Sequence, residues 1–345
     1  MRKSFILKVL SPLAILFCTS QFCASAANWE NISDPLVAAV TNASGPIPWP
    51  GDTAGVAVDR ATGTLYVDVC NVGLWRSTDH GRTFQRAAEG QISGRAEFGY
   101  SLNCDPAGGR MACFLLDGKC GMTLDGGLTW HPFAPMGRNW DYGAVDWSDP
   151  GARWIFASRH ESGGEMYLSD NAGTSWRFIG KHPEFTSVAA FDSGILEAGT
   201  DSGIIRSTDD GQTWTNISAF HPVGRVAEYF HGKTWWLARE GLITSRDNGV
   251  TWQRVGNVPS PNAGWGPLFG KNTRQIVVAD LDGILQSRNG GKTWRRIAPL
   301  PPFEGGLTPH LPGEFVCLAW DPKANILYGS RMGSATYRLQ LDDNR

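Results

Sequence analysis

Polar side chains that could take part in catalysis recur at corresponding points of the sequence, where a β-prone run ends close to a glycine. Arginine stands at three of these points, and its guanidinium group can pair in a bidentate way with the carboxylate of an acidic ligand. Carboxyl groups and histidine at the other points could move protons. With one tyrosine from a connecting segment, the candidate catalytic residues are Asp68, Asp117, Asp201, Glu240, Asp282, His160 and Tyr142.

The three arginines and several residues of the connecting segments are the candidate substrate-binding set. Two interpretations stay open for each arginine, which could hold a substrate or pair with an acid of a neighbouring repeat. His160 could be a general base or a hydrogen-bonded loop side chain, and the tryptophans could stack on sugars or pack under loops. The set is Arg159, Arg239, Arg331, Arg138, Trp140, Trp265, His182 and His221.

A short repeated motif reveals the elements that must position these residues. It reads Ser-x-Asp-x-Gly-x-Thr-aromatic, and successive copies begin 46, 46, 38, 38 and 42 residues apart. This period is the length of one four-stranded blade of a β-propeller. The six copies span 77–84, 123–130, 169–176, 207–214, 245–252 and 287–294.

The residue types of the motif predict a tight hairpin between two strands. Short polar side chains hydrogen-bond within their own turn, and glycine allows a positive φ. The aromatic residue begins the next strand, where we expect it to pack between neighbouring blades. A calcium-binding loop is the alternative, but six near-identical copies at hairpins favour a structural role. The aspartates of the motif are therefore not candidate catalytic groups.

The blade count comes to seven, which makes an all-β, seven-bladed propeller. Three strands follow the sixth motif, and residues 28–33, which resemble the outer strand of the fourth blade, supply the missing fourth strand and close the ring. Two long Pro- and Gly-rich segments, 34–53 and 299–314, are expected to be loops that form one wall of a cleft. The predicted blades are 54–87, 97–133, 143–179, 186–218, 224–256, 265–298 and 315–340 with 28–33.

Propeller topology separates the turns into two faces. When the strands of a blade are lettered A to D, the A–B and C–D turns share one face, and the B–C loops and blade-to-blade connections share the other. The motifs occupy C–D turns. The candidate residues above fall on the opposite face, where loops of many blades converge near the central channel.

The motifs resemble Asp-box (BNR) repeats, and the resemblance covers nearly the whole chain after residue 27. It implies a propeller fold and leaves the activity open, because proteins with this repeat include sialidases, xyloglucan-cleaving hydrolases, sortilin-type receptors and photosystem II assembly factors. The chain lacks the early Phe/Tyr-Arg-Ile-Pro motif of sialidases. Where the xyloglucan hydrolases have a catalytic aspartate, this chain has Cys70, with Asp68 two positions earlier.

The resemblance and the polar B–C face together predict a carbohydrate-active enzyme that cleaves glycosidic bonds of an extracellular, uronate-containing polysaccharide or glycoconjugate. Glycoside hydrolysis by two carboxyl groups is the first expectation. A polysaccharide lyase acting by β-elimination beside a uronate is the second. A non-catalytic propeller that binds protein partners, like assembly factors or sortilin-type receptors, is the third.

The N-terminal 26 residues have the features of a secretory signal peptide, with basic residues before an uncharged run and Ala24-Ser25-Ala26 as a cleavage site. We therefore expect a secreted, monomeric protein, extracellular or periplasmic, with its propeller over 27–345 and no membrane span. Near-neutral charge, 31 basic against 33 acidic residues, argues against nucleic-acid binding. No metal site or cofactor motif is predicted. Five cysteines remain, which allow at most two disulfides and are expected to be mainly small buried residues: Cys70, Cys104, Cys113, Cys120 and Cys317.

Overall fold

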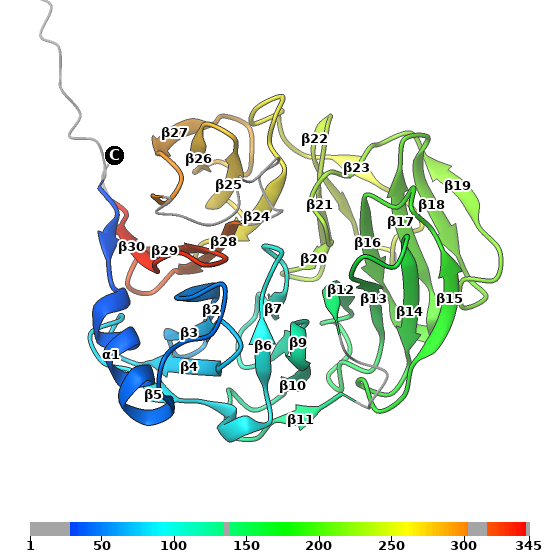
Figure 1. Ribbon diagram of the computed structural model, residues 1–345. Coiled ribbons are helices and arrows are strands. Elements are labelled where there is room, and N and C mark those ends of the chain that lie inside the picture. The colour runs from blue at the N-terminus through cyan, green and yellow to red at the C-terminus, as the bar shows by residue number, and fades with distance from the viewer. Residues whose placement is uncertain (1–27, 134–138, 303–315, 343–345) are drawn as a thin grey trace, which may run out of the picture.

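A computed structural model describes residues 28–133, 139–302 and 316–342. The described chain forms seven four-stranded antiparallel sheets arranged in a ring (Figure 1). In each sheet the first strand faces the centre and the fourth lies at the outside, where its residues are mostly exposed. The predicted seven-bladed propeller is thus confirmed, with blade limits within a few residues of the predicted ones.

The first three blades carry the extra elements that shape the candidate site. Blade 1 contains β2 (Thr53–Asp59), β3 (Thr64–Val69), β4 (Gly73–Ser77) and β5 (Gln85–Arg86). Blade 2 contains β7 (Leu102–Cys104), β8 (Met111–Cys113), β10 (Gly121–Thr123) and β11 (His131–Pro132), and a separate pair, β6 (Ser93–Arg95) with β9 (Leu116–Lys119), lies beside it. Blade 3 contains β12 (Trp140–Val145), β13 (Ile155–Arg159), β14 (Glu165–Ser169) and β15 (Arg177–Lys181).

The remaining four blades complete the ring. Blade 4 contains β16 (Ser187–Ala190), β17 (Leu196–Thr200), β18 (Gly203–Ser207) and β19 (Thr215–Ser218), and blade 5 contains β20 (Glu228–Tyr229), β21 (Thr234–Ala238), β22 (Gly241–Ser245) and β23 (Gln253–Arg254). Blade 6 contains β24 (Trp265–Phe269), β25 (Ile276–Asp280), β26 (Gly283–Ser287) and β27 (Arg295–Ala298). Blade 7 contains β28 (Val316–Asp321), β29 (Ile326–Arg331), β30 (Tyr337–Gln340) and β1 (Glu30–Asn31). Short 3-10 turns cover Ala88–Gly90 (η1) and Asp192–Gly194 (η2).

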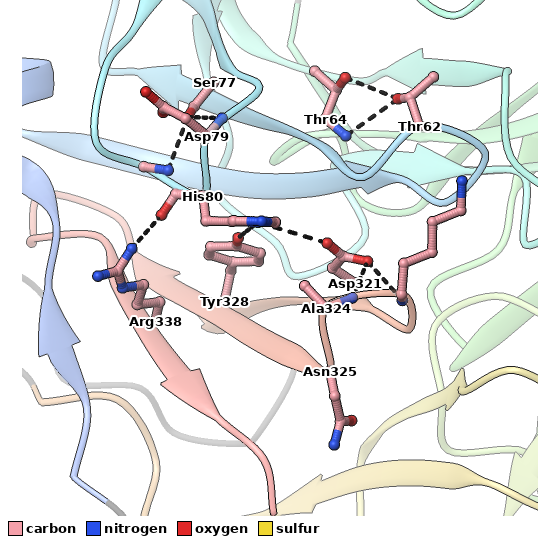
Figure 2. A network of polar contacts seen from close by, with 12 residues as sticks. Thr62, Thr64, Ser77, Asp79, His80, Asp321, Ala324, Asn325, Tyr328 and Arg338 are labelled. Carbon is pink, nitrogen blue, oxygen red and sulfur yellow. Dashed lines mark hydrogen bonds and ion pairs between the residues drawn. The ribbon is translucent and has the colours of Figure 1, made fainter. Parts of the chain in front are cut away.

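The ring is closed by the N-terminal strand, as the sequence predicts. Strand β1 pairs antiparallel with β30, so that Glu30 lies opposite Arg338. Figure 2 shows the adjoining contacts between blades 7 and 1, where Arg338 donates to the carbonyl of His80 at 2.7 Å. The ring of His80 lies 3.3 Å from the hydroxyl of Tyr328 and 3.8 Å from the buried carboxyl of Asp321. The motif turn of blade 1 is therefore tied to three positions of blade 7.

Each motif closes its own turn through side-chain hydrogen bonds. In the first copy Ser77 donates to Asp79 at 2.8 Å, the amide of Gly81 donates to Ser77 at 2.8 Å, and Thr83 donates to Asp79 from its amide and its hydroxyl. Burial is the largest single effect on Asp79 and opposes its ionisation, but the hydrogen bonds together outweigh it and lower its pKa to about 2. The carboxylate is thus engaged within its own turn, consistent with the structural role predicted for the motif.

The motif aromatics pack between neighbouring blades, as predicted. Trp130 of blade 2 meets Tyr66 of blade 1 edge to face, with ring centroids 6.1 Å apart. Trp214 of blade 4 stacks near Phe156 of blade 3 at 6.2 Å. Trp252 of blade 5 donates its indole N–H to a buried glutamate of blade 4 at 2.9 Å. Each aromatic therefore joins its own blade to the preceding one.

One segment differs from its prediction. Residues 34–53 were expected to be a loop, but Ser33–Ser44 form helix α1 beside blade 1 (Figure 1). Leu36 and Val40, one helical turn apart, are fully buried, and Pro35 lies in the first turn, where a missing N–H removes no helical hydrogen bond. The packing of Leu36 and Val40 thus orders the helix, whereas the Pro- and Gly-rich end of the segment had suggested a loop.

The five cysteines of the described chain are free thiols. Four are buried and Cys104 is half-buried, which confirms the expectation of small buried residues and leaves no disulfide among the five. Burial raises the pKa of Cys70 and Cys120 to about 12. The described residues also include no helix long and apolar enough to cross a membrane.

Candidate functional site

Three titratable side chains meet on the face formed by the B–C loops and the blade connections. The Nδ1 atom of His160 lies 2.7 Å from a carboxyl oxygen of Asp141, and its Nε2 atom lies 3.8 Å from a carboxyl oxygen of Glu97. The imidazole ring is thus held between these two carboxyl groups, and a carboxyl oxygen of the exposed Glu161 also lies 3.8 Å from Nε2. All three side chains are partly accessible, with exposed fractions of 19%, 13% and 14% for His160, Asp141 and Glu97. We call this group the Glu97–Asp141–His160 cluster.

Backbone pairing fixes the position of the cluster. Strand β6 leads directly into Glu97 and pairs with β9, which ties the connection into blade 2 to the B–C loop of that blade. Asp141 is the extra residue of a β-bulge between β12 and β13, an irregularity that redirects a side chain. His160 follows the end of β13 and donates its amide N–H to the carbonyl of Asn139 at 2.8 Å. Three connections are thereby brought to one place.

Burial makes both carboxyl groups of the cluster weaker acids than usual. Burial raises the pKa of Asp141 to about 6, although the neighbouring imidazole opposes the shift. Burial also raises the pKa of Glu97, with Arg95 and His160 opposing it and Glu161 reinforcing it. Groups that exchange protons near neutral pH are those best suited to general acid–base catalysis.

Aromatic rings and a guanidinium group form one side of the cluster. The guanidinium carbon of Arg225 lies 5.2 Å from the ring centroid of Phe98 and 5.6 Å from that of Tyr142. The two rings meet edge to face at 6.2 Å. Tyr142, a predicted catalytic residue, is buried, and burial raises its pKa. The structure therefore brings Tyr142 next to the cluster as part of its wall.

An exposed tryptophan lies on the other side, and sequence reasoning did not select it. Arg95 pairs with Asp117, and its guanidinium carbon lies 5.2 Å from the ring centroid of Trp49. The carbonyl of Trp49 accepts a hydrogen bond from Asn71 at 2.9 Å. Trp49 nevertheless has an exposed fraction of 67%, unusual for so large an apolar side chain. Its place in a segment expected to be a loop was the available signal.

The three predicted substrate-binding arginines lie on three different blades. Arg159 contacts Glu165 of its own blade at 3.4 Å, and Arg239 contacts Asp201 of the preceding blade at 3.2 Å. Arg331 is largely buried, and burial lowers its pKa. Arg239 thus takes part in an ion pair of the kind predicted as the alternative, whereas Arg159 pairs within its own blade, and the substrate-binding role of all three stays a prediction.

The predicted catalytic acids also occupy separate surroundings. Asp68 is fully buried directly behind the cluster, accepts the amide N–H of Ala96 at 2.7 Å, and has its pKa raised by burial to about 8. Glu240 accepts hydrogen bonds from His221, including one to Nδ1 at 2.6 Å. The other three acids are exposed on their loops beside arginines: Asp117 by Arg95, Asp201 by Arg239 and Asp282 by Arg296.

The remaining predicted residues pack against neighbours. Trp140 is fully buried against Tyr167 and Trp176, and Trp265 is buried in a stack with Tyr100. His182 stacks on Phe185 with ring centroids 4.3 Å apart and approaches Glu184. Arg138 and the predicted signal peptide lie outside the described residues. No group of three or more His, Cys, Asp or Glu side chains in the described ranges could hold a metal ion.

Of the comparisons with known proteins, the search of solved structures finds matches. A scan against protein-family models finds no match, and a search of curated proteins finds none either. Among solved structures, the β-propeller domain of Myceliophteria thermophila Cps50 (Swd1) is 12% identical, with a TM-score of 0.54, covering 86% of this chain and 98% of that one. YCF48 bound to D1 peptide is 15% identical, with a TM-score of 0.49, covering 87% and 95%. The Niastella koreensis GH74 enzyme is 15% identical, with a TM-score of 0.36, covering 85% and 64%.

Proposed function

We propose that this protein is an exported carbohydrate-active enzyme that cleaves a uronate-containing glycan by β-elimination at the Glu97–Asp141–His160 cluster. The observation that carries the proposal is the imidazole of His160, held by Asp141 at one nitrogen and facing Glu97 with the other. An aspartate at Nδ1 fixes the ring and its tautomer, leaving Nε2 as the base.

The reaction needs two proton transfers on one side of the sugar. Nε2 of His160 takes the proton from C5 of the uronate, the C4–C5 double bond forms, and the bond from C4 to the leaving oxygen breaks. Glu97 in its protonated form, which burial favours by raising its pKa, gives its proton to that oxygen. The imidazolium then returns a proton to Glu97 across the 3.8 Å gap, after a small movement, and the cluster is restored.

Positive charge beside the cluster supports an acidic substrate. Removal of the C5 proton becomes easier when the uronate carboxylate is neutralised. The guanidinium group of Arg225 acts electrostatically on Asp141, and that of Arg95 acts on Glu97, so both bring positive charge to the place where the substrate carboxylate would bind. The exposed ring of Trp49 beside Arg95 offers a face on which a sugar can stack.

Hydrolysis at the same cluster is the second candidate, favoured by two carboxyl groups with raised pKa values. Inverting hydrolases hold a water molecule between carboxyl groups about 6.5–9.5 Å apart. Here the imidazole of His160 lies between Asp141 and Glu97, where that water would need to be. The geometry therefore favours elimination over the hydrolysis expected first from the sequence.

Membership of the Asp-box family and export through the N-terminal segment belong to the same proposal. They are supported by six self-closed motif turns and by the composition of residues 1–26. A propeller that only binds a protein partner is the remaining alternative from the sequence, and it requires no acid–base group on this face.

An activity screen tests the proposal. The mature protein is incubated with neutral and uronate-containing polysaccharides, and both new reducing ends and the ultraviolet absorbance of an unsaturated uronate are followed. Elimination gives both signals, on uronate-containing substrates alone. Reducing ends without absorbance would assign hydrolysis instead, and the absence of both signals over a broad panel would favour the binding role.

A further inference from the structure

The centre of the propeller contains a chamber that the proposed catalytic cluster does not use. It is lined by the inner strands β2, β7, β24 and β28 and by Glu228 of β20, at the middle of the ring in Figure 1. The centres of water-sized molecules can occupy a volume of about 70 Å³ in it. A single water needs about 10–15 Å³ on this measure, so the chamber holds roughly five waters or one small organic molecule.

Tyr100 closes the chamber toward the B–C face. Its hydroxyl accepts the amide N–H of Gly266 at 2.7 Å and lies 3.1 Å from the carbonyl of the same residue. Tyr100 belongs to blade 2 and Gly266 to blade 6, so this contact spans the channel. The ring also stacks on Trp265 at 5.5 Å. The chamber is therefore separated from the Glu97–Asp141–His160 cluster by a fully bonded side chain.

Arg60 closes the chamber toward the face that carries the motifs. It extends from blade 1 across to blade 6, where it donates to the carbonyl groups of Phe269 and Gly270, and its guanidinium carbon lies 4.9 Å from the ring centroid of Phe230 in blade 5. Beyond Arg60 lies an open vestibule of about 420 Å³, whose lining includes Trp147 and Lys271. Arg60 and Pro106 line both spaces, so the two spaces adjoin at these residues.

Glu228 is the one carboxylate among the residues that line the chamber. In the described structure no hydrogen-bond donor reaches its carboxyl group, and Arg60, the nearest charge of opposite sign, is bonded to backbone carbonyls. The walls around it are aromatic and aliphatic, including Tyr100, Trp265 and Trp320. Glu228 is half-buried and lines the chamber, so a donor group of a molecule bound there can reach its carboxylate.

We propose that the chamber is a binding site for a small organic ammonium compound, which enters past Arg60 and pairs its cationic group with Glu228. The ammonium supplies the missing donors to the carboxylate, and the aromatic walls hold the apolar part and attract the cation through their ring faces. This site is independent of the proposed elimination, because Tyr100 separates the two and no residue is shared.

Proton release accompanies binding in this account. Burial raises the pKa of Glu228 to about 8, Asp105 reinforces the shift and Arg60 opposes it, so the free carboxyl group carries a proton near neutral pH. The other titratable groups that face it are Tyr100 and Cys104, whose own pKa values are raised by burial. An ammonium ion favours the ionised carboxylate, so each binding event at about pH 7 releases a proton.

Calorimetric titration with benzylamine tests the proposal, with benzyl alcohol as the uncharged probe of similar shape. We expect saturable binding of benzylamine, weaker binding of benzyl alcohol, and affinity for the amine that rises more than about tenfold from about pH 6 to about pH 8. In E228Q the affinity should fall about 10–150-fold, the range for a hydrogen-bonded charge pair. The matched control D170N removes an exposed carboxylate from the turn after β14 and should bind normally.

Three results would overturn the proposal: no binding of benzylamine by the folded wild-type protein, equal affinity in wild type and E228Q, or binding without proton release. The heats in buffers of different ionisation enthalpy measure the released proton in the wild-type protein alone, so the proposal stays testable if E228Q does not fold. These binding measurements do not depend on polysaccharide cleavage, so they remain a valid test of the chamber even if the protein proves not to cleave polysaccharides.

Discussion

Arg338 is expected to be the side chain that most strongly fastens the closing strand to the first blade. It donates to both carboxyl oxygens of Glu30 at 2.8 Å. It also donates to the carbonyl of His80 at 2.7 Å (Figure 2). Glu30 is 61% exposed, so its pair contributes only about 0.2–1 kcal/mol. The bond to the partly buried carbonyl of His80 comes from a charged donor and contributes about 1.5–3 kcal/mol. R338M should therefore lower the free energy of unfolding by about 2–3 kcal/mol, and E30Q by no more than about 1 kcal/mol.

Urea unfolding followed by tryptophan fluorescence measures both variants, with E30Q/R338M completing a double-mutant cycle. The cycle should give a coupling energy below about 1 kcal/mol, because most of the effect of Arg338 passes through His80. R239M, which removes an arginine from an exposed pair with Asp201, is the control and should leave the unfolding midpoint unchanged. An E30Q variant as destabilised as R338M, or an R338M variant as stable as wild type, would refute this reasoning.

Four further predictions follow. Burial alone would raise the pKa of Asp280, but hydrogen bonds from Arg296 and its own turn lower it. D280N should therefore lower the free energy of unfolding by about 2 kcal/mol at neutral pH, a modest value because Arg296 is partly exposed. This difference from wild type should disappear in acid, as the pH falls from the ordinary carboxyl pKa through the lowered pKa of Asp280. L36A should lose about 2–5 kcal/mol in urea unfolding, since Leu36 is fully buried between α1 and the ring. W49A should raise the KM for glycan about tenfold with little change in kcat, because the ring contacts sugar without moving protons. The cleavage rate should fall below about pH 6, where Asp141 gains a proton and no longer fixes the imidazole, and D141N should cleave more slowly than wild type above that pH.

Each of these has a clear contrary result. If the difference in unfolding free energy between D280N and wild type grew in acid, the pKa of Asp280 would have to be raised by folding, not lowered. An L36A variant within about 1 kcal/mol of wild type would mean that α1 adds little to the fold. A W49A variant with normal KM would remove the stacking role, and a pH profile unchanged in D141N would separate Asp141 from the proton transfers.

The sequence predicted the propeller because the fold is encoded locally and repeatedly. Each motif carries its own turn chemistry, and six copies at blade-length spacing leave few alternative folds. The closing strand was predictable because residues 28–33 resemble the outer strand of the fourth blade. Helix α1 was missed because only two buried apolar residues, Leu36 and Val40, define its inner face, and the segment ends in Gly and Pro residues.

The site was harder to predict, because it depends on contacts between distant connections. His160 and Tyr142 were selected, and the structure brings them to one place. Glu97 and Asp141 were visible only as polar residues of connections, since nothing in a single sequence states that a bulge would turn Asp141 toward His160. Glu228 looked like an ordinary strand residue, and its position in the central chamber became apparent only with the ring closed.

The comparison of H160Q with wild type on a uronate-containing polysaccharide tests the central claim most directly. H131Q, which changes an exposed histidine of β11, is the matched control. The account predicts that H160Q loses about 10²–10⁴-fold in the rate of unsaturated product formation, while H131Q and the thermal unfolding of both variants stay close to wild type. An H160Q protein that cleaves as fast as wild type would contradict the assignment of the cluster as the catalytic site.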